Sequence, residues 1–228
     1  MRALLVPLLA LLLTAASGAQ FEGKVQMKMT DGRASTHTLT YSIKGNLVRT
    51  DVELAEGQTA SAIINPDKDQ MTMLLPSQQM YMVMPVRRTA AAAGHDIDEV
   101  QIEKTGETEK ILGYDCTKYL VKSNGSTTEV WATDELGTFM GLGSSSGPFG
   151  RRQPSAAWEK ALTGKNFFPL RVSTAPGDKT TSAFRLEATA IKKESLPDSL
   201  FTPPENYRKL DMSGLPGVGG ASPFGQRP

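Results

Sequence analysis

Residues 38–54 read TLTYSIKGNLVRTDVEL and carry the pattern of two strands joined by a tight turn. Apolar and polar side chains alternate on both sides of Gly45-Asn46, with Leu39 and Tyr41 on one face of the first strand. Alternation with a period of two is typical of a strand that is buried on one face. Gly and Asn both tolerate a positive φ, which a two-residue hairpin turn requires. The stretch therefore predicts an antiparallel hairpin with one apolar face.

The same alternation continues outward from this hairpin in both directions. Turn-forming stretches such as Asn65-Pro66-Asp67 separate the alternating segments. The expected strands are 21–29, 38–44, 47–54, 59–64, 71–75, 80–86, 100–102, 116–122, 127–133, 170–174 and 181–191. Short strands joined by short turns predict an antiparallel meander.

One helix is expected among these strands, at residues 156–163. Ser155 can cap its start, and Trp158 and Leu162 lie four residues apart on one face. A sheet of about ten strands curls rather than staying flat. We therefore predict a mainly β fold, a curved antiparallel sheet or open half-barrel covered by one main helix and loops. Each strand has one apolar face, and this face of the sheet must pack against another body. That body is either the helix with the loops or a bound apolar molecule.

The two ends of the chain differ in composition from the middle. Residues 1–19 begin with Arg2, continue with an apolar run and end in Ser17-Gly18-Ala19, which is the arrangement of a secretory signal peptide. Residues 211–228 are rich in Gly and Pro and lack periodicity, so we expect a disordered tail. A single β-rich domain is expected over 20–210. No later stretch reaches the length of a spanning helix, so we expect no transmembrane segment in the mature chain.

Composition excludes several classes of function. The 25 basic and 24 acidic residues are nearly balanced, which excludes a polybasic nucleic-acid binder. The single cysteine, Cys116, excludes an internal disulfide framework and is expected to be a buried structural thiol. The two histidines, His37 and His95, leave little for metal binding or general-base chemistry. The main interpretation therefore includes no enzyme activity, no catalytic residue, no cofactor and no metal site.

The segment 105–116, TGETEKILGYDC, and the following strand resemble a bacterial secreted family, domain of unknown function number 4412. The matching residues are Gly106, Thr108, Ile111, Gly113, Tyr114, Cys116, Glu129, Val130 and Trp131. The opening Phe21-x-Gly23, the strand Met80-Tyr81-Met82 and the closing FTPPENY at 201–207 extend the resemblance over about residues 20–210. The family is similar in plan to the periplasmic lipoprotein carriers of the LolA/LppX type. The resemblance implies secretion to the periplasm and an unclosed barrel with a hydrophobic cavity, but it transfers no functional residue.

Methionine is the most unusual feature of the composition. Seven of the ten methionines lie in Met-x-Met repeats on expected strands. They are Met27, Met29, Met71, Met73, Met80, Met82 and Met84. Core packing is one interpretation, because Met fills irregular gaps. An adaptable pocket for acyl chains or another apolar ligand is the second, and a thioether site for Cu(I) is the third.

Three functions follow from these interpretations. The first is a non-enzymatic protein that binds a lipid or other apolar ligand on the concave sheet, with the seven methionines and Trp131 as the candidate binding residues. The second is an envelope structural or protein-interaction module that binds a partner protein through a sheet edge or the 141–150 loop. The third is a Met-rich Cu(I)-binding protein.

Overall fold

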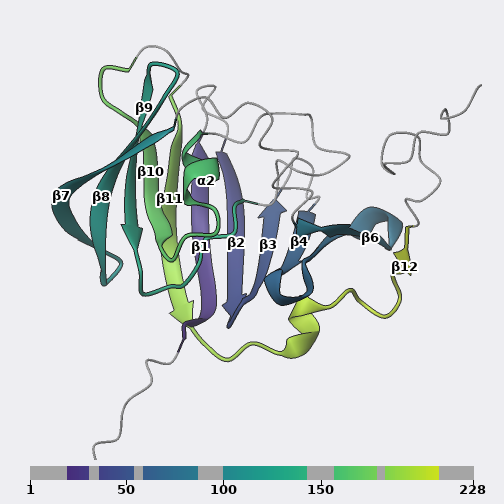
Figure 1. The fold of residues 1–228 in the computed structure, drawn as a ribbon. Coiled ribbons are helices and arrows are strands. Elements are labelled where there is room, and N and C mark those ends of the chain that lie inside the picture. The colour runs from purple at the N-terminus through teal and green to yellow at the C-terminus, as the bar shows by residue number, and fades with distance from the viewer. Residues whose placement is uncertain are drawn as a thin grey trace, which may run out of the picture.

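The structure is a computed structural model that describes residues 20–30, 36–53, 59–86, 100–142, 157–178 and 183–210. The expected signal peptide at 1–19, most of the 141–150 loop and the expected tail at 211–228 lie outside these residues. In the described part, twelve strands form a single open sheet in the order β12-β6-β5-β4-β3-β2-β1-β11-β10-β9-β8-β7 (Figure 1).

The strands follow the expected meander with one interruption. Their bounds are β1 (Glu22–Thr30), β2 (Thr36–Lys44), β3 (Leu47–Glu53), β4 (Thr59–Asn65), β5 (Gln70–Leu75), β6 (Met80–Pro85), β7 (Gln101–Ile111), β8 (Tyr114–Ser123), β9 (Ser126–Thr133), β10 (Phe168–Thr174), β11 (Arg185–Lys193) and β12 (Arg208–Lys209). Strand β11 returns to lie between β1 and β10, and so joins the two halves of the sheet. The mainly β, curved-sheet prediction is confirmed.

The register assigns every strand a face. Residues that lie directly opposite each other on paired strands point to the same side of a sheet. One such row runs through Val25, Tyr41, Thr50 and Ala62 to Met73 and Met82. We call this side the inner face and the opposite side the outer face. The main hydrophobic core lies on the inner face, where helix α2 (Ala157–Leu162) lies against the sheet (Figure 1).

A C-terminal segment covers the outer face of strands β1 to β6. Residues 194–207 leave β11, cross beneath the sheet and end at β12, which pairs in parallel with β6 (Figure 1). We call residues 194–207 the strap. Lys44 Nζ lies 2.6 Å from the Asp198 carboxylate and donates to the carbonyl of Leu196 at 2.7 Å. Arg49 donates to the carbonyl of Leu200 at 3.1 Å. These bonds fix the strap backbone to β2 and β3.

The strap and the sheet form a second, smaller hydrophobic core. Leu196 and Phe201 are buried against Ile63 of β4 and Leu74 of β5, on the outer face. The half-buried Tyr207 packs against the same cluster. The strap therefore covers part of the outer face of β4 and β5.

Two elements differ from the sequence-based expectation. Strand β7 was expected at 100–102 but extends from Gln101 to Ile111. Its residues alternate Lys, Glu and Thr, so it shows no apolar face, and a bulge between Lys104 and Thr108 contains Gly106 at φ +84°. Strand β12 was not expected, because two exposed residues held by backbone bonds leave no hydrophobic pattern.

Phe201→Ala should lower the free energy of unfolding by about 3 kcal/mol, because it removes a buried aromatic ring from a small core. Urea denaturation of both proteins measures the difference. Ser199→Ala, at an exposed position of the same strap, should change stability by less than about 0.5 kcal/mol. Equal effects of the two substitutions would show that the strap core contributes little.

Candidate functional site

All seven candidate methionines lie on the inner face of the sheet. Met73 is directly opposite Met82, and Met71 is opposite Met84. Met80 is two residues from Met82 on β6 and therefore shares its face. Met27 and Met29 occupy the same face on β1, where Met27 lies opposite Leu39. Strands β5 and β6 thus carry an inner face made of Met71, Met73, Leu75, Met80, Met82 and Met84, which we call the methionine face.

The methionines differ in how well they are covered. Met27 and Met82 are fully buried, and Met71 is 5% exposed. Met29 and Met84 are half-buried and pack against the main core. Met73 and Met80 are also half-buried, but they pack against neither of the two hydrophobic clusters formed by the described residues. Met73 and Met80 are therefore the two half-buried methionines that lie outside both clusters.

Trp131 lies on the outer face, away from the methionines. The register leads from Met29 through Leu186 and Val172 to Val130, so Val130 shares the methionine side. Trp131 instead lies opposite Arg171 and Lys118, and the Lys118 ammonium lies 5.8 Å from the centre of the indole ring. The structure therefore does not bring Trp131 together with the other candidate residues.

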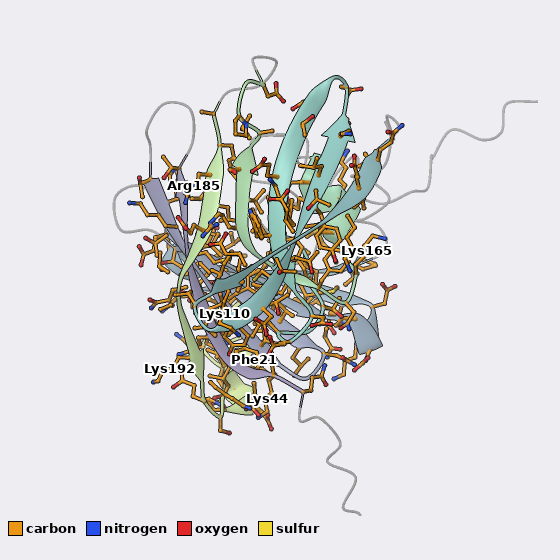
Figure 2. All side chains as sticks on the ribbon, turned by 90° about the vertical axis from the view of Figure 1, so that its left-hand side faces the viewer. Phe21, Lys44, Lys110, Lys165, Arg185 and Lys192 are labelled. Atoms are coloured by element: carbon orange, nitrogen blue, oxygen red, sulfur yellow. The ribbon has the colours of Figure 1, made fainter. Side chains whose placement is uncertain are left out.

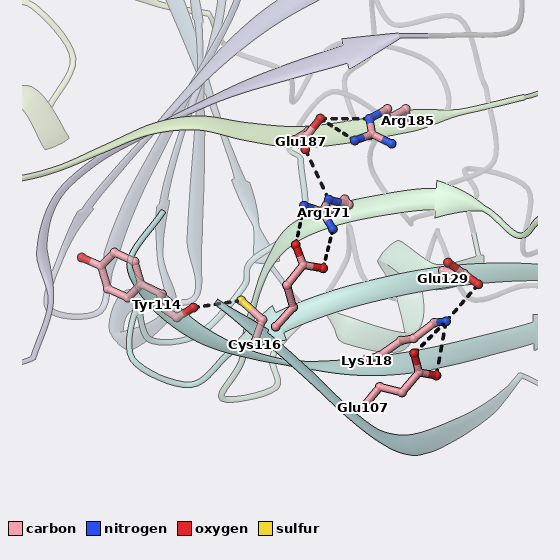
Figure 3. A network of polar contacts seen from close by, with 9 residues as sticks. Glu107, Tyr114, Cys116, Lys118, Glu129, Arg171, Arg185 and Glu187 are labelled. Carbon is pink, nitrogen blue, oxygen red and sulfur yellow. Dashed lines mark hydrogen bonds and ion pairs between the residues drawn. The ribbon is translucent and has the colours of Figure 1, made fainter. Parts of the chain in front are cut away.

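The outer face around Trp131 carries a network of ion pairs (Figure 3). Arg171 binds the Glu109 carboxylate through two nitrogens, at 2.8 and 3.0 Å, and also contacts Glu187 at 3.3 Å. Lys118 contacts Glu129 at 3.2 Å and Glu107 at 3.4 Å. The bonds from Arg171 hold the pKa of Glu109 below its ordinary value. Carboxylates paired in this way are charged and screened at neutral pH, which suits a solvated sheet face.

The ion pairs extend across the outer surface of this half of the sheet. Figure 2 shows Lys110, Arg185 and Lys192 on the side of the molecule turned to the viewer, on β7 and β11. On the outer face Arg185 lies 2.7 Å from Glu187, whereas Lys110, which lies 2.7 Å from Asp115, belongs to the inner side by register. This half of the outer face is therefore covered by charged side chains, whereas the half near β1 to β6 is covered by the strap.

Cys116 lies next to this network and is buried, as expected for a structural thiol. It is 1% exposed, and its Sγ lies 3.7 Å from the carbonyl of Tyr114 (Figure 3). Burial raises the pKa of the thiol to about 11. The thiol is therefore protonated at neutral pH, and a nucleophilic role would require the thiolate.

The inner face near α2 is filled by aromatic side chains of the protein itself. Tyr41 and Phe168 come from the sheet, Phe139 comes from the segment before the helix, and Trp158 comes from α2. Their ring centres lie 5.1 to 5.9 Å apart in stacked and edge-on pairs. Aromatic pairs in this range stabilise a core beyond the area that they bury. This half of the inner face is therefore closed by the chain.

A buried carboxylate sits beside this aromatic cluster. Glu159 of α2 is 7% exposed, and its Oε1 accepts a hydrogen bond from the backbone N–H of Leu142 at 2.7 Å. The Tyr41 hydroxyl donates to the carbonyl of Gly141, the preceding residue. Burial raises the pKa of Glu159, and it also raises the pKa of Tyr41. The two side chains fix residues 141–142 between the helix and β2.

The sequence analysis missed Glu159, although its spacing carried a clue. Residue 159 follows Trp158 and precedes Leu162 by three positions, so it falls at the border of the apolar face of the helix. A glutamate at such a position ordinarily faces solvent. Only the fold of residues 136–142 over the helix shows that the carboxylate is buried.

Metal binding finds limited support on this surface. The described ranges contain no group of three His, Cys, Asp or Glu residues that could hold a metal ion. His37 lies directly opposite Met29, which places one imidazole beside one thioether. The Cu(I) alternative therefore stays a prediction.

Among the described residues, no helix is long and apolar enough to cross a membrane.

Glu159→Gln should flatten the dependence of stability on pH. The folded state holds the proton of Glu159 more tightly than the unfolded state, because burial raises the carboxyl pKa. The free energy of unfolding therefore falls as the pH rises above the ordinary glutamate value of about 4.5 and through the raised pKa. The amide keeps an oxygen for Leu142 and removes the charge. Chemical denaturation from acid to neutral pH measures the effect, and the exposed Glu205→Gln variant is the control. Parallel curves for wild type and Glu159→Gln would contradict this.

Cys116 should resist alkylation while the protein is folded. At pH 8 the buried thiol is almost entirely protonated, so iodoacetamide should modify it only after denaturant is added. Intact-protein mass spectrometry over time gives the rate, with reduced glutathione as the reference thiol. A native rate equal to that of glutathione would show that the thiol is accessible.

The comparisons with known proteins show a family but name no activity. No curated protein matches the sequence. An uncharacterised conserved protein from Thermus thermophilus is similar over 83% of this chain and 90% of its own, at 11% identity and a TM-score of 0.48. PNGF-II is similar over 84% of this chain but only 31% of its own, at 18% identity and a TM-score of 0.49. A LolA superfamily protein from Nitrosomonas europaea is similar over 80% of this chain and 89% of its own, at 10% identity and a TM-score of 0.33.

At these identities and scores, the structural likenesses identify no shared ligand or partner. The family comparison is more direct. The model of the domain of unknown function DUF4412 matches residues 21–207, which include all twelve strands except the last. The resemblance seen in the sequence is confirmed, and the chain belongs to the DUF4412 family.

Proposed function

We propose that the protein is exported to the periplasm and binds a lipid or another apolar ligand without acting as an enzyme. The ligand lies on the methionine face of β5 and β6. The observation that carries this proposal is the contrast between the two halves of the inner face. Near α2 the chain fills the face with Tyr41, Phe139 and Trp158, whereas at β5 and β6 the half-buried Met73 and Met80 lie outside both described clusters.

The chemistry of the methionine face suits such a ligand. Its six side chains on β5 and β6 are all apolar, so it offers no charge to a polar substrate. Methionine side chains are unbranched and polarisable, and they adapt to apolar partners of different shape. Ala62 lies opposite Met73 on β4, and Thr50 follows on β3. These small residues are buried beside the long methionine side chains.

Met73→Lys should lower the affinity for an anthroyloxy-labelled fatty acid by about tenfold, because it places a charge on an apolar binding face. Val83→Lys is the matched control, since Val83 is also half-buried on β6 but points to the outer face. The control should bind the probe as the wild type does. Fluorescence titration gives the affinities, and circular dichroism checks that both variants fold.

Two further measurements test the proposal as a whole. Mass spectrometry of an organic extract should find lipid that copurifies with the wild type from the periplasm. Cell fractionation should recover the mature chain in the periplasmic fraction. Absence of both copurified lipid and saturable probe binding would overturn the ligand proposal.

A further inference from the structure

We propose that Met73 and Met80 form a reversible oxidation site that controls apolar binding on the methionine face. This inference rests on the proposed function and adds a regulatory reaction to it. The oxidant is hydrogen peroxide, and the restoring reaction is a thiol-dependent reduction of methionine sulfoxide.

Exposure separates Met73 and Met80 from the buried Met27, Met71 and Met82, and packing separates them from the half-buried Met29 and Met84, which lie against the main core. Met27 and Met82 are fully buried, whereas Met73 and Met80 are half-buried and free of both described clusters. Peroxide must reach the sulfur lone pair, so the reaction follows accessibility. The seven methionines of one sheet face therefore include both reactive and protected members, in the same chain and at the same peroxide concentration.

The reaction changes the property on which binding depends. The thioether sulfur attacks one peroxide oxygen, the O–O bond breaks, and an S–O bond forms. The sulfur loses two electrons, the peroxide gains them, and the second oxygen takes up the proton of the transferred oxygen and leaves as water. The product is a polar sulfoxide, which disrupts methionine-rich apolar contacts.

The neighbours of Met73 and Met80 differ in whether they can donate a hydrogen bond to a sulfoxide oxygen. Met73 has Ala62 and Met82 as its cross-strand neighbours, and neither side chain offers a hydrogen-bond donor to a sulfoxide oxygen. Met80 lies opposite Leu75 on β5 and opposite the exposed Arg208 on β12. The guanidinium of Arg208 stands on the same face and can donate to a sulfoxide at Met80. Oxidation at Met73 therefore costs apolar binding, while the sheet edge at Met80 accommodates the product.

The first test measures where oxidation occurs. Folded wild-type protein is treated with hydrogen peroxide, and peptide mass spectrometry follows each methionine. Met73 and Met80 should form sulfoxide about tenfold faster than Met27 and Met82. In denaturant all four should react at similar rates. Equal protection of the four methionines in the folded protein would overturn the proposal. Cys116 should stay unmodified in the folded protein, which excludes thiol oxidation as the cause of any change.

The second test measures what oxidation does. Binding of the anthroyloxy-labelled fatty acid should weaken about fivefold after oxidation and recover after treatment with methionine sulfoxide reductase and dithiothreitol. The Met73→Leu/Met80→Leu variant has no thioether at either position, so peroxide should leave its probe affinity at the value measured for that variant before treatment. Probe binding by the wild type that survives oxidation overturns this inference alone. Failure of the untreated wild type to bind the probe overturns the proposed function and this inference with it.

Discussion

The structure depends on how one open sheet covers both of its faces. A sheet that long buries apolar side chains on each strand, and it has only one short helix among the described residues to shield them. The strap closes the outer face of β1 to β6 through Phe201 and Leu196. Ion pairs such as Arg171 with Glu109 make the outer face of β7 to β11 compatible with water. The inner face near α2 is covered by the helix and the aromatic cluster around Tyr41, whereas on the methionine face Met73 and Met80 are half-buried outside both described clusters.

The alternation of apolar and polar residues predicted most of the strands. Side-chain parity, meaning the alternation of successive side chains between the two faces of a strand, is a local property of the chain. Strands at 38–44 and 71–75 were found within two residues of β2 and β5. The pattern failed at β7, where both faces are polar, and at β12, where two residues cannot show a period. In both cases the strand is formed by backbone pairing alone. Backbone pairing does not require a side-chain pattern that could be recognised in the sequence.

The candidate site was predictable strand by strand but not across strands. Parity places Met71 with Met73 and Met80 with Met82 on one strand face, and the register confirms that these faces coincide. Parity also places Trp131 and Val130 on opposite faces of β9, but it cannot say which of them joins the methionines. That assignment passes through β10 and β11, because β11 inserts between β1 and β10. The separation of Trp131 from the methionines therefore follows from topology, and the omission of Glu159 was one of tertiary burial.

The two edges of the sheet bear on the alternative that the protein pairs with a partner through a sheet edge. Strand β7 has Lys104 and Lys110 at its outer border and a bulge at Gly106, and both features hinder the addition of another strand. Strand β12 occupies the edge of β6 at Met80 and Tyr81, next to the methionine face. Pairing through either edge would have to overcome these features, whereas an apolar ligand on the methionine face needs no backbone partner. The distribution of charge, bulges and methionine thus favours binding on a face of the sheet over binding at its edges.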